Sequence, residues 1–144
     1  MARLGVSSTL KVADAKAMNS WHGGDLFDAI LLDGPCSGTG VISRHPDIKL
    51  LRRPTDIKQF ADELFRLLKG VWQALKPGGY LLYSTCSIFS MENDQVVSRF
   101  LKSCNQAMLI PISHPLAVSK TYGIQFVPSA QGPNGLYYSL IQRK

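Results

Sequence analysis

Short runs of apolar residues alternate along this chain with longer segments whose apolar residues recur every three or four positions. Residues 27–32 are nearly continuous in apolar character, which is typical of a parallel strand buried on both faces. Residues 80–84 form a second apolar run, which we interpret as a strand. Residues 8–12 have the pattern of a further strand, which would end at Asp14.

Two segments have the period of an amphipathic helix. In the first, Asp56 is expected to cap the helix, with Gln59 in the reciprocal position, and residues 76–79 are expected to end it. Its apolar stripe comprises Phe60, Leu64, Leu67, Leu68, Val71, Trp72 and Leu75. In the second, Ser90 is expected to be the N-cap, with Glu92 in the first turn. Its inner face comprises Val96, Val97, Phe100, Leu101 and Cys104.

The last part of the chain is expected to form an antiparallel pair of strands from residues 124–127 and 136–141, with a turn signal at residues 133–135. The alternation of strands and helices before it predicts an α/β fold with a mostly parallel sheet. No glycine-rich turn leads from a strand into a helix, as a dinucleotide-binding fingerprint requires. The early glycines are Gly5, Gly23 and Gly24.

The length and composition of the chain limit which kinds of protein and which kinds of binding partner are possible. A chain of 144 residues corresponds to about one domain, and 45% hydrophobic residues are enough to build a core. Sixteen basic residues against ten acidic ones give a net charge of +6, which suits a polyanionic partner such as nucleic acid. Three cysteines without metal-ligand spacing, and no signal peptide, indicate a reducing cytoplasm and no bound metal. No apolar run is long enough to span a membrane.

Two of the cysteines, Cys36 and Cys86, each follow the end of a predicted strand. Asp33 ends the first of these strands. In open α/β sheets, ligands bind in the crevice beyond the carboxyl ends of the strands. We therefore expect both thiols and the Asp33 carboxylate to meet at one edge of the sheet and to perform covalent chemistry. Cys104 falls on the apolar face of a helix and is expected to lie in the core.

The sequence DGPCSGTG at residues 33–40, followed by YSTCS at residues 83–87, resembles the paired signature of the RNA cytosine-5 methyltransferases, which use S-adenosylmethionine. The stretch from Asp33 to Lys49 is most similar to the bacterial 16S ribosomal RNA branch, the RsmB (Sun/Fmu) type. The resemblance implies the C-terminal portion of a Rossmann-like S-adenosylmethionine-dependent methyltransferase fold. Residues 1–144 would then be a partial catalytic domain, without the N-terminal strands and the glycine-rich cofactor turn.

The resemblance also implies a reaction, the methylation of C5 of a cytosine in ribosomal RNA, 16S being the expected target. The family's counterpart of Cys86 adds to C6 of the cytosine, which makes C5 nucleophilic toward the methyl donor. The counterpart of Cys36 assists release of the product from this adduct. The counterpart of Asp33 lies near the methyl donor and hydrogen-bonds the target base. Asp14 corresponds to an aspartate that contacts the adenosine part of the cofactor.

A basic segment, residues 43–53, follows the turn that carries Cys36. Within it, Arg44 and Lys49 are expected to contact RNA phosphates, which fix position rather than sequence. A solvated charged loop would show the same composition. The chain departs from the family at Gly34, where alanine is more common, and at Ala13, where glycine is frequent.

Two alternative functions stay open. DNA cytosine-5 methyltransferases take their nucleophile from a Pro-Cys motif, which would make Cys36 the attacking group, but that class lacks a cysteine equivalent to Cys86. Alternatively, the chain is an inactive RNA-binding or structural fragment, and the missing cofactor turn favours this for the 144 residues in isolation. We expect these residues alone to be inactive and not to bind S-adenosylmethionine at micromolar concentration. A missing half-sheet also predicts an exposed apolar strand edge.

Overall fold

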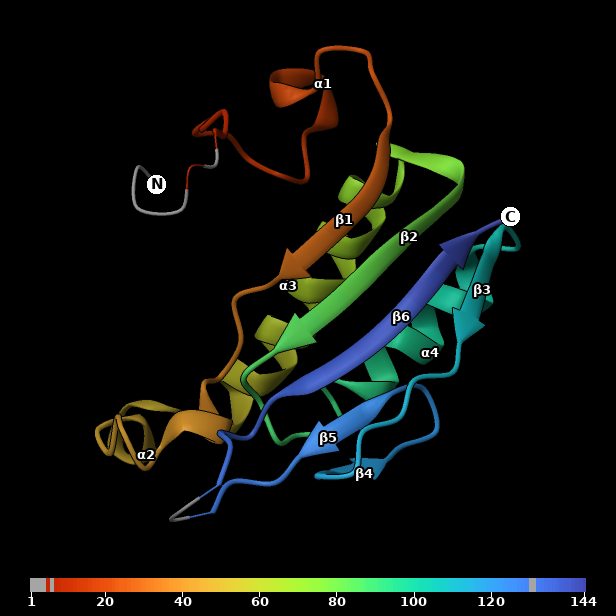
Figure 1. Ribbon diagram of the computed structural model, residues 1–144. Coiled ribbons are helices and arrows are strands. Elements are labelled where there is room, and N and C mark those ends of the chain that lie inside the picture. The colour runs from red at the N-terminus through yellow and green to blue at the C-terminus, as the bar shows by residue number, and fades with distance from the viewer. Residues whose placement is uncertain (1–4, 6, 130–131) are drawn as a thin grey trace.

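The computed structural model describes residue 5, residues 7–129 and residues 132–144. Figure 1 shows a twisted sheet with two longer helices behind it. Within the described residues the sheet has six strands in the order β1-β2-β6-β5-β4, and β3 also pairs with β6. The strands are β1 (Phe27–Asp33), β2 (Leu75–Thr85), β3 (Ala107–Ile110), β4 (Ala117–Ser119), β5 (Ile124–Phe126) and β6 (Tyr137–Arg143). The helices are α1 (Met18–Trp21), the 3-10 helix η2 (Thr39–Val41), α2 (Ile48–Leu51), α3 (Pro54–Trp72) and α4 (Asp94–Ser103).

The pairing of the strands confirms the α/β class and the antiparallel C-terminal strands. β1 and β2 are parallel, as a connection through the long helix α3 requires. β6 then inserts antiparallel to β2, and its other partners β3 and β5 are antiparallel as well. The described sheet is therefore mixed: parallel at its start and antiparallel at its end.

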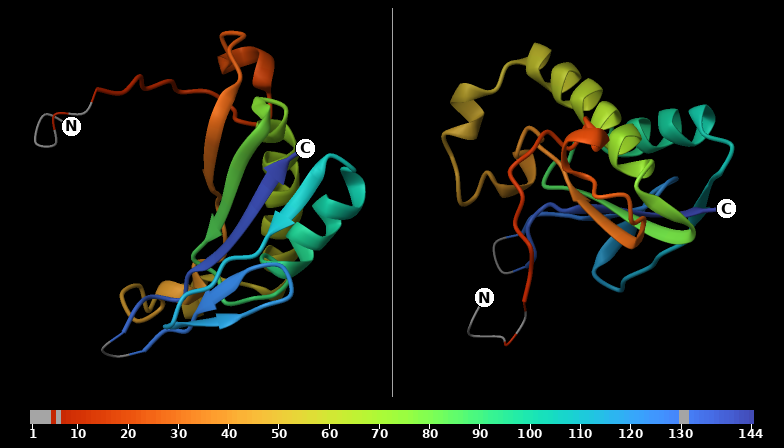
Figure 2. Two further views of the ribbon diagram at one scale, coloured as in Figure 1. Left: turned by 45° about the vertical axis from the view of Figure 1, so that its right-hand side comes forward. Right: turned by 90° about the horizontal axis from the view of Figure 1, so that it is seen from above.

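Both longer helices cover the same face of the sheet, as the view from above in Figure 2 shows. The prediction that residues 27–32 are buried on both faces is therefore wrong. Leu32 faces α3 and is buried, whereas the neighbouring Leu31 is 65% exposed on the face that no described element covers. Among the described strands β1 pairs only with β2, which leaves the expected apolar edge open.

The expected strand at residues 8–12 does not form. A strand needs a neighbour to accept and donate its backbone hydrogen bonds, and the sheet of the described residues has none beside this segment. Leu10 and Val12 are accordingly 91% and 100% exposed. Asp14 therefore lies in an irregular segment before α1, and not at the end of a strand.

The first amphipathic helix is confirmed, but its ends differ from the prediction. α3 begins at Pro54, a residue whose fixed φ suits the first helical turn. Asp56 is thus in the third helical position, where its carboxylate accepts a hydrogen bond from the Arg53 N–H at 2.9 Å. At the other end, Leu75 belongs to β2, because it pairs with Phe27 of β1. The helix therefore stops before the proline and glycines that were expected to end it.

The second helix also begins later than the sequence suggests. α4 starts at Asp94, so that Ser90 and Glu92 lie in the turn before it. The Ser90 carbonyl accepts backbone hydrogen bonds from Asn93 and Gln95, which closes this turn. Glu92 is fully buried there, and is not an exposed acid in a first helical turn.

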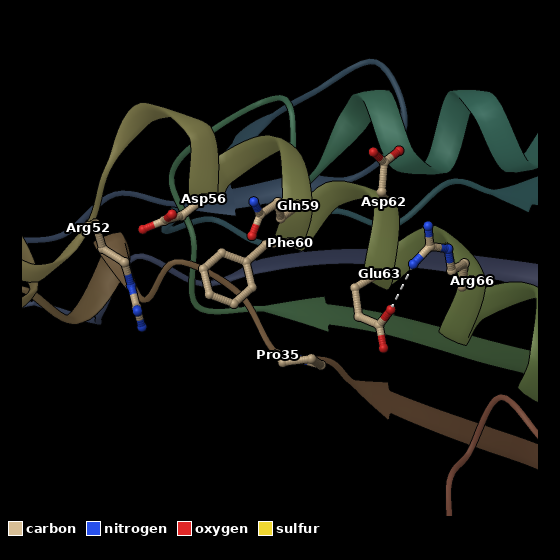
Figure 3. Close-up of a pocket in the computed structure, with 8 residues that line it drawn as sticks. All are labelled: Pro35, Arg52, Asp56, Gln59, Phe60, Asp62, Glu63 and Arg66. Atoms are coloured by element: carbon tan, nitrogen blue, oxygen red, sulfur yellow. Dashed lines mark hydrogen bonds and ion pairs between the residues drawn. The ribbon is translucent and has the colours of Figure 1, made fainter.

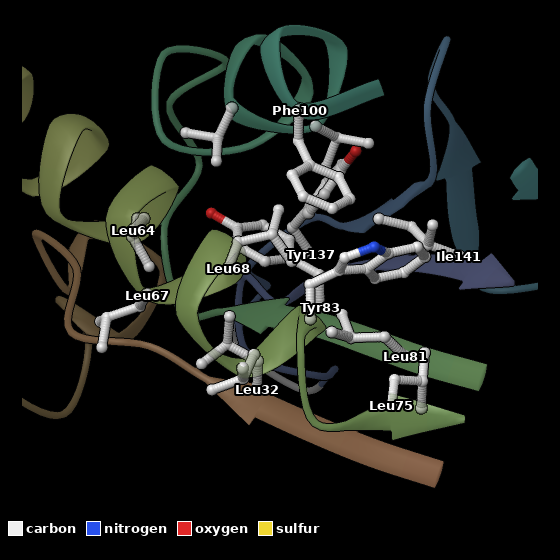
Figure 4. Close-up of a cluster of buried hydrophobic side chains, with 14 of the residues drawn as sticks. Leu32, Leu64, Leu67, Leu68, Leu75, Leu81, Tyr83, Phe100, Tyr137 and Ile141 are labelled. Carbon is white, nitrogen blue, oxygen red and sulfur yellow. The ribbon is translucent and has the colours of Figure 1, made fainter. Parts of the chain in front are cut away.

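The core lies between the sheet and the two helices, as Figure 4 shows. Leu64 and Leu68 of α3 are fully buried, as the apolar stripe predicts, and each contributes about 1.5–3 kcal/mol by burial. Tyr83 and Tyr137 from adjacent strands are also fully buried and meet edge to face, with ring centroids 6.2 Å apart. Cys104 packs against this core as expected. No helix in the described residues is long and apolar enough to span a membrane.

Candidate active site

The parallel pairing of β1 and β2 brings the two cysteines together. The register places Asp33 opposite Ser84, and the Gly34 N–H continues the pairing with a bond to the Ser84 carbonyl at 3.3 Å. Cys36 and Cys86 follow immediately, at the same edge of the sheet. Their sulfur atoms lie 3.3 Å apart, which is hydrogen-bonding distance for a thiol and a thiolate. The expectation that both thiols meet at the carboxyl ends of the strands is confirmed.

Close backbone contacts hold the turn that carries Cys36. The Gly40 N–H donates to the Cys86 carbonyl at 2.8 Å, and the Gly40 carbonyl accepts from the Gly135 N–H at 2.8 Å. A Cβ on Gly40 would lie 1.8 Å from the Gly135 carbonyl oxygen, so only glycine fits at this position. Gly38 has a φ of 76°, in the left-handed region that favours glycine. These contacts join three segments of the chain around the cysteine pair.

The contact between the sulfur atoms shifts the pKa values of the two thiols in opposite directions. The hydrogen bond from Cys36 is the main cause that lowers the pKa of Cys86 from 9.0 to about 7, against the opposing effect of burial. The same hydrogen bond, together with burial, raises the pKa of Cys36. These directions favour Cys86 as the first of the two thiols to ionise. The charges of Asp33 and Glu92 oppose this ionisation more weakly.

A buried polar cluster lies directly beneath the cysteine turns. The Glu92 carboxylate accepts hydrogen bonds from the backbone N–H and the hydroxyl of Ser37, both at 2.7 Å, and from the Ser87 hydroxyl. Thr39 lies within 3.3 Å of both hydroxyls. Sequence reasoning missed this cluster. The available signal was that a serine follows each of the two cysteines and that an acidic residue follows the second serine closely.

The two candidate cofactor-binding aspartates lie in different parts of the fold. Asp33 ends β1 with its side chain exposed at the same edge as the cysteines. Asp14 lies before α1, where its carboxylate accepts from the Lys16 N–H at 3.0 Å. Lys16 in turn pairs with Glu63 of α3. Within the described part of the chain, no hydrogen bond or ion pair joins Asp14 to Asp33 or to either cysteine.

The basic segment lies next to the cysteine turn. Arg44 and Lys49 are both exposed, and Lys49 lines a groove of about 640 Å³ together with Phe89, which is 41% exposed. Phe89 is three residues beyond Cys86, so the groove starts beside the candidate site. Other residues that line it are Ile42, Ile48, Arg53, Ile57 and Met91.

Arg52 has a role in the structure that sequence reasoning did not assign. Its Nε donates to the Ser37 carbonyl at 2.9 Å, and its guanidinium lies 5.1 Å from the centre of the Phe60 ring. It thereby ties the start of α3 to the turn after Cys36. Figure 3 shows Arg52, Phe60 and Pro35 around a second cavity, of about 570 Å³, which charged side chains of α3 line on its other side. Neither cysteine lines this cavity, so it is separate from the thiol pair.

A family model described as 16S rRNA methyltransferase RsmB/F matches residues 1–142. This chain belongs to that family. It is 47% identical over 130 residues to the probable ribosomal RNA small subunit methyltransferase B of Coxiella burnetii. The matched residues make up 90% of this chain and 30% of that protein. It is 43% identical over 145 residues to ribosomal RNA small subunit methyltransferase B of Klebsiella pneumoniae, covering 100% of this chain and 33% of that protein. The chain spans about a third of the length of these RsmB/F relatives.

Solved structures agree with the family assignment. NSun6 from Pyrococcus horikoshii, solved with SFG, has a TM-score of 0.83 and 25% identity, covering 99% of this chain and 36% of that chain. A methyltransferase homolog protein from the same organism has a TM-score of 0.80 and 28% identity, covering 99% of this chain and 47% of that one. The resemblance to RsmB-type enzymes and the Rossmann-like methyltransferase fold are thereby confirmed.

Proposed function

We propose that the protein to which this chain belongs methylates C5 of a cytosine in ribosomal RNA, 16S being the expected target, with Cys86 as nucleophile and Cys36 as the group that assists product release. The observation that carries the proposal is the contact of the two sulfur atoms at 3.3 Å, which places the two thiols against each other at the carboxyl edge of the sheet. A thiolate, and not a thiol, is the nucleophile in such chemistry. The lowered pKa of Cys86 favours Cys86 over Cys36 as the attacking group.

Cys86 and Cys36 match the first and the last step of the reaction. The Cys86 thiolate forms a bond to C6 of the cytosine, and the displaced electron pair makes C5 nucleophilic. C5 would take the methyl group from S-adenosylmethionine, so that the C5–CH3 bond forms as the sulfonium S–CH3 bond breaks and S-adenosylhomocysteine leaves. A base then removes the C5 proton, and the electron pair of that C–H bond restores the double bond as the Cys86 sulfur leaves. Cys36 lies against the Cys86 sulfur and is placed to assist this departure.

The exposed carboxylate of Asp33 fits a role beside the cofactor and the base. It lies at the carboxyl edge of the sheet, where ligands of such folds bind, and it is near enough to act on the charge of Cys86. The related NSun6 was solved with SFG, an S-adenosylmethionine analogue, which supports S-adenosylmethionine as the methyl donor. Asp14 is proposed to contact the adenosine part of the cofactor, on the resemblance alone.

The basic segment supports contact with RNA. Arg44 and Lys49 are exposed beside the cysteine turn, and the groove that Lys49 lines brings apolar and cationic side chains together. Such a surface suits a flexible nucleic acid, whose phosphates pair with cations while its bases contact apolar groups. The family description supports small-subunit ribosomal RNA as the substrate.

A covalent-trapping experiment tests the proposal in the full-length protein. Cys36→Ala is incubated with small-subunit ribosomal RNA and S-adenosylmethionine, and a denaturant-resistant protein–RNA band is expected, because the adduct forms but is released slowly. Cys86→Ala should give no band, and Cys104→Ala, in the core away from the pair, should behave like the wild type. A band that persists in Cys86→Ala and is lost in Cys36→Ala would reverse the two roles. No band in any variant would contradict covalent catalysis.

A further inference from the structure

One buried carboxylate has no part in the chemistry proposed above. Glu92 has no exposed surface and lies in the turn between β2 and α4. Removing a carboxylate from water is unfavourable unless hydrogen bonds compensate for the lost hydration. Glu92 receives three such bonds, and all of them come from Ser37 and Ser87.

These two serines identify what Glu92 connects. Ser37 follows Cys36 directly, and Ser87 follows Cys86 directly. Both Ser37 bonds are 2.7 Å long, and one of them uses the backbone N–H, so the bond restrains the turn itself and not only a side chain. A single carboxylate thus bridges the ends of two strands that are fifty residues apart in the sequence.

The position of Glu92 is itself restrained. The Tyr83 hydroxyl, within the core, donates to the Glu92 carbonyl. The next residue, Asn93, donates from its side-chain amide to the Ser87 carbonyl at 2.9 Å. The Thr85 hydroxyl donates to the Asn93 side-chain oxygen at 2.5 Å. The carboxylate is therefore held from β2 and from the start of α4, as a rigid support requires.

The charge of Glu92 works against the candidate nucleophile. A negative group near Cys86 disfavours its thiolate, and Glu92 does raise the pKa of Cys86, although other causes outweigh it. The negative charge of Glu92 therefore cannot be what activates Cys86, because it raises the pKa of Cys86. What Glu92 can contribute is geometry, since its two oxygens accept bonds from both turns at once.

We propose that Glu92 is a positioning residue, whose carboxylate clamps the Cys36 turn to the Cys86 turn through Ser37 and Ser87 and thereby holds the two sulfur atoms in hydrogen-bonding contact. The inference rests on the proposed function, since the contact matters for catalysis if Cys86 attacks and Cys36 assists release. Without the clamp, the two turns separate and the Cys36 thiol no longer donates a hydrogen bond to Cys86. Cys86 then loses the interaction that does most to lower its pKa.

The test measures the ionisation of Cys86 in the full-length protein, without RNA or cofactor. The rate of Cys86 alkylation by iodoacetamide is followed against pH by peptide mass spectrometry. The wild type is expected to have its midpoint at about 7. In Glu92→Ala the midpoint rises toward that of Cys36→Ala, because the thiol contact is lost. In Glu92→Gln it stays at or below the wild-type value, because the amide keeps the bridge with the serines and lacks the opposing charge.

These outcomes separate a clamp from other roles. If Glu92 acted by charge alone, both variants would lower the midpoint, and a lowered midpoint in Glu92→Ala overturns the proposal. If it served stability alone, Glu92→Ala would leave the midpoint unchanged, as is expected for Leu101→Ala, a substitution against the core in the last turn of α4. An unchanged midpoint in Glu92→Ala therefore also overturns it.

A second variant and the absence of RNA from the assay complete the test. If Glu92→Ala does not fold, Ser87→Ala removes one of the three bonds and is expected to raise the midpoint by a smaller amount. A midpoint at the wild-type value in that variant overturns the clamp. Because the assay contains no RNA, its failure leaves the methylation proposal intact, whereas failure of the trapping experiment leaves the measured midpoints intact.

Discussion

Replacing Cys36 with alanine removes the thiol that donates to Cys86, and the ionisation of Cys86 is expected to respond first. That contact is the largest cause of the lowered pKa, about 7 in place of the ordinary 9.0. Burial and the charges of Asp33 and Glu92, which raise the pKa, remain in the variant. We therefore expect the pKa of Cys86 in Cys36→Ala to return to its ordinary value of 9.0 or to exceed it.

The effect on reactivity is smaller than the change in ionisation suggests. At about pH 7 a thiol with a pKa of about 7 is half ionised, whereas one with a pKa of 9.0 is about 1% ionised, a ratio of roughly fifty. A thiolate of higher pKa is more nucleophilic, by a factor of about 8 for a Brønsted coefficient of about 0.45. The two effects together leave alkylation of Cys86 about sixfold slower in Cys36→Ala at neutral pH.

Alkylation of Cys86 by iodoacetamide is followed by peptide mass spectrometry from about pH 5 to 10. This experiment measures both the pKa of Cys86 and its rate of alkylation at neutral pH. The thiolate is the reactive form, so the rate rises with pH and its midpoint reports the pKa. The midpoint is expected at about 7 in the wild type and at 9.0 or above in Cys36→Ala. Cys36→Ser is the matched control, because its hydroxyl still donates and keeps the midpoint below that of the alanine variant. A midpoint near 7 in Cys36→Ala refutes the reasoning.

Two further predictions concern the fold and the RNA surface. Gly40→Ala is expected to destabilise the protein by about 1–3 kcal/mol or more in urea denaturation, because the added Cβ would lie 1.8 Å from the Gly135 carbonyl oxygen. Gly23→Ala, whose Cβ meets no atom within 4 Å, is the control, and equal stabilities of the two variants would contradict the prediction. Lys49→Ala is expected to weaken RNA binding and to reduce the slope of log affinity against log salt by about 0.7–0.9. An unchanged slope would show that Lys49 makes no phosphate contact.

The local pattern of apolar residues was sufficient to predict the main helices and strands. It was not sufficient to predict where each of them begins and ends. The stripe that contains Leu64 and Leu68 identifies α3, because a helix that covers a sheet must repeat its apolar residues at the helical period. Its start at Pro54 and the inclusion of Leu75 in β2 depend on the backbone and on pairing with β1. The alternating pattern of residues 8–12 has strand character, but a strand forms only where a partner lies beside it.

The residues of the candidate chemistry could be predicted from local sequence, because each of the two cysteines stands in a short motif at the end of an apolar strand. How these residues act on one another depends on the folded chain. The register of β1 against β2 brings Cys36 within 3.3 Å of Cys86, fifty residues further along the chain, and this contact determines which thiol ionises. The burial of Glu92 against Ser37, fifty-five residues away, likewise follows from how the strands end together. The physical reason is that local preferences act between near neighbours, whereas hydrogen bonding and ionisation depend on groups that only the folded chain brings into contact.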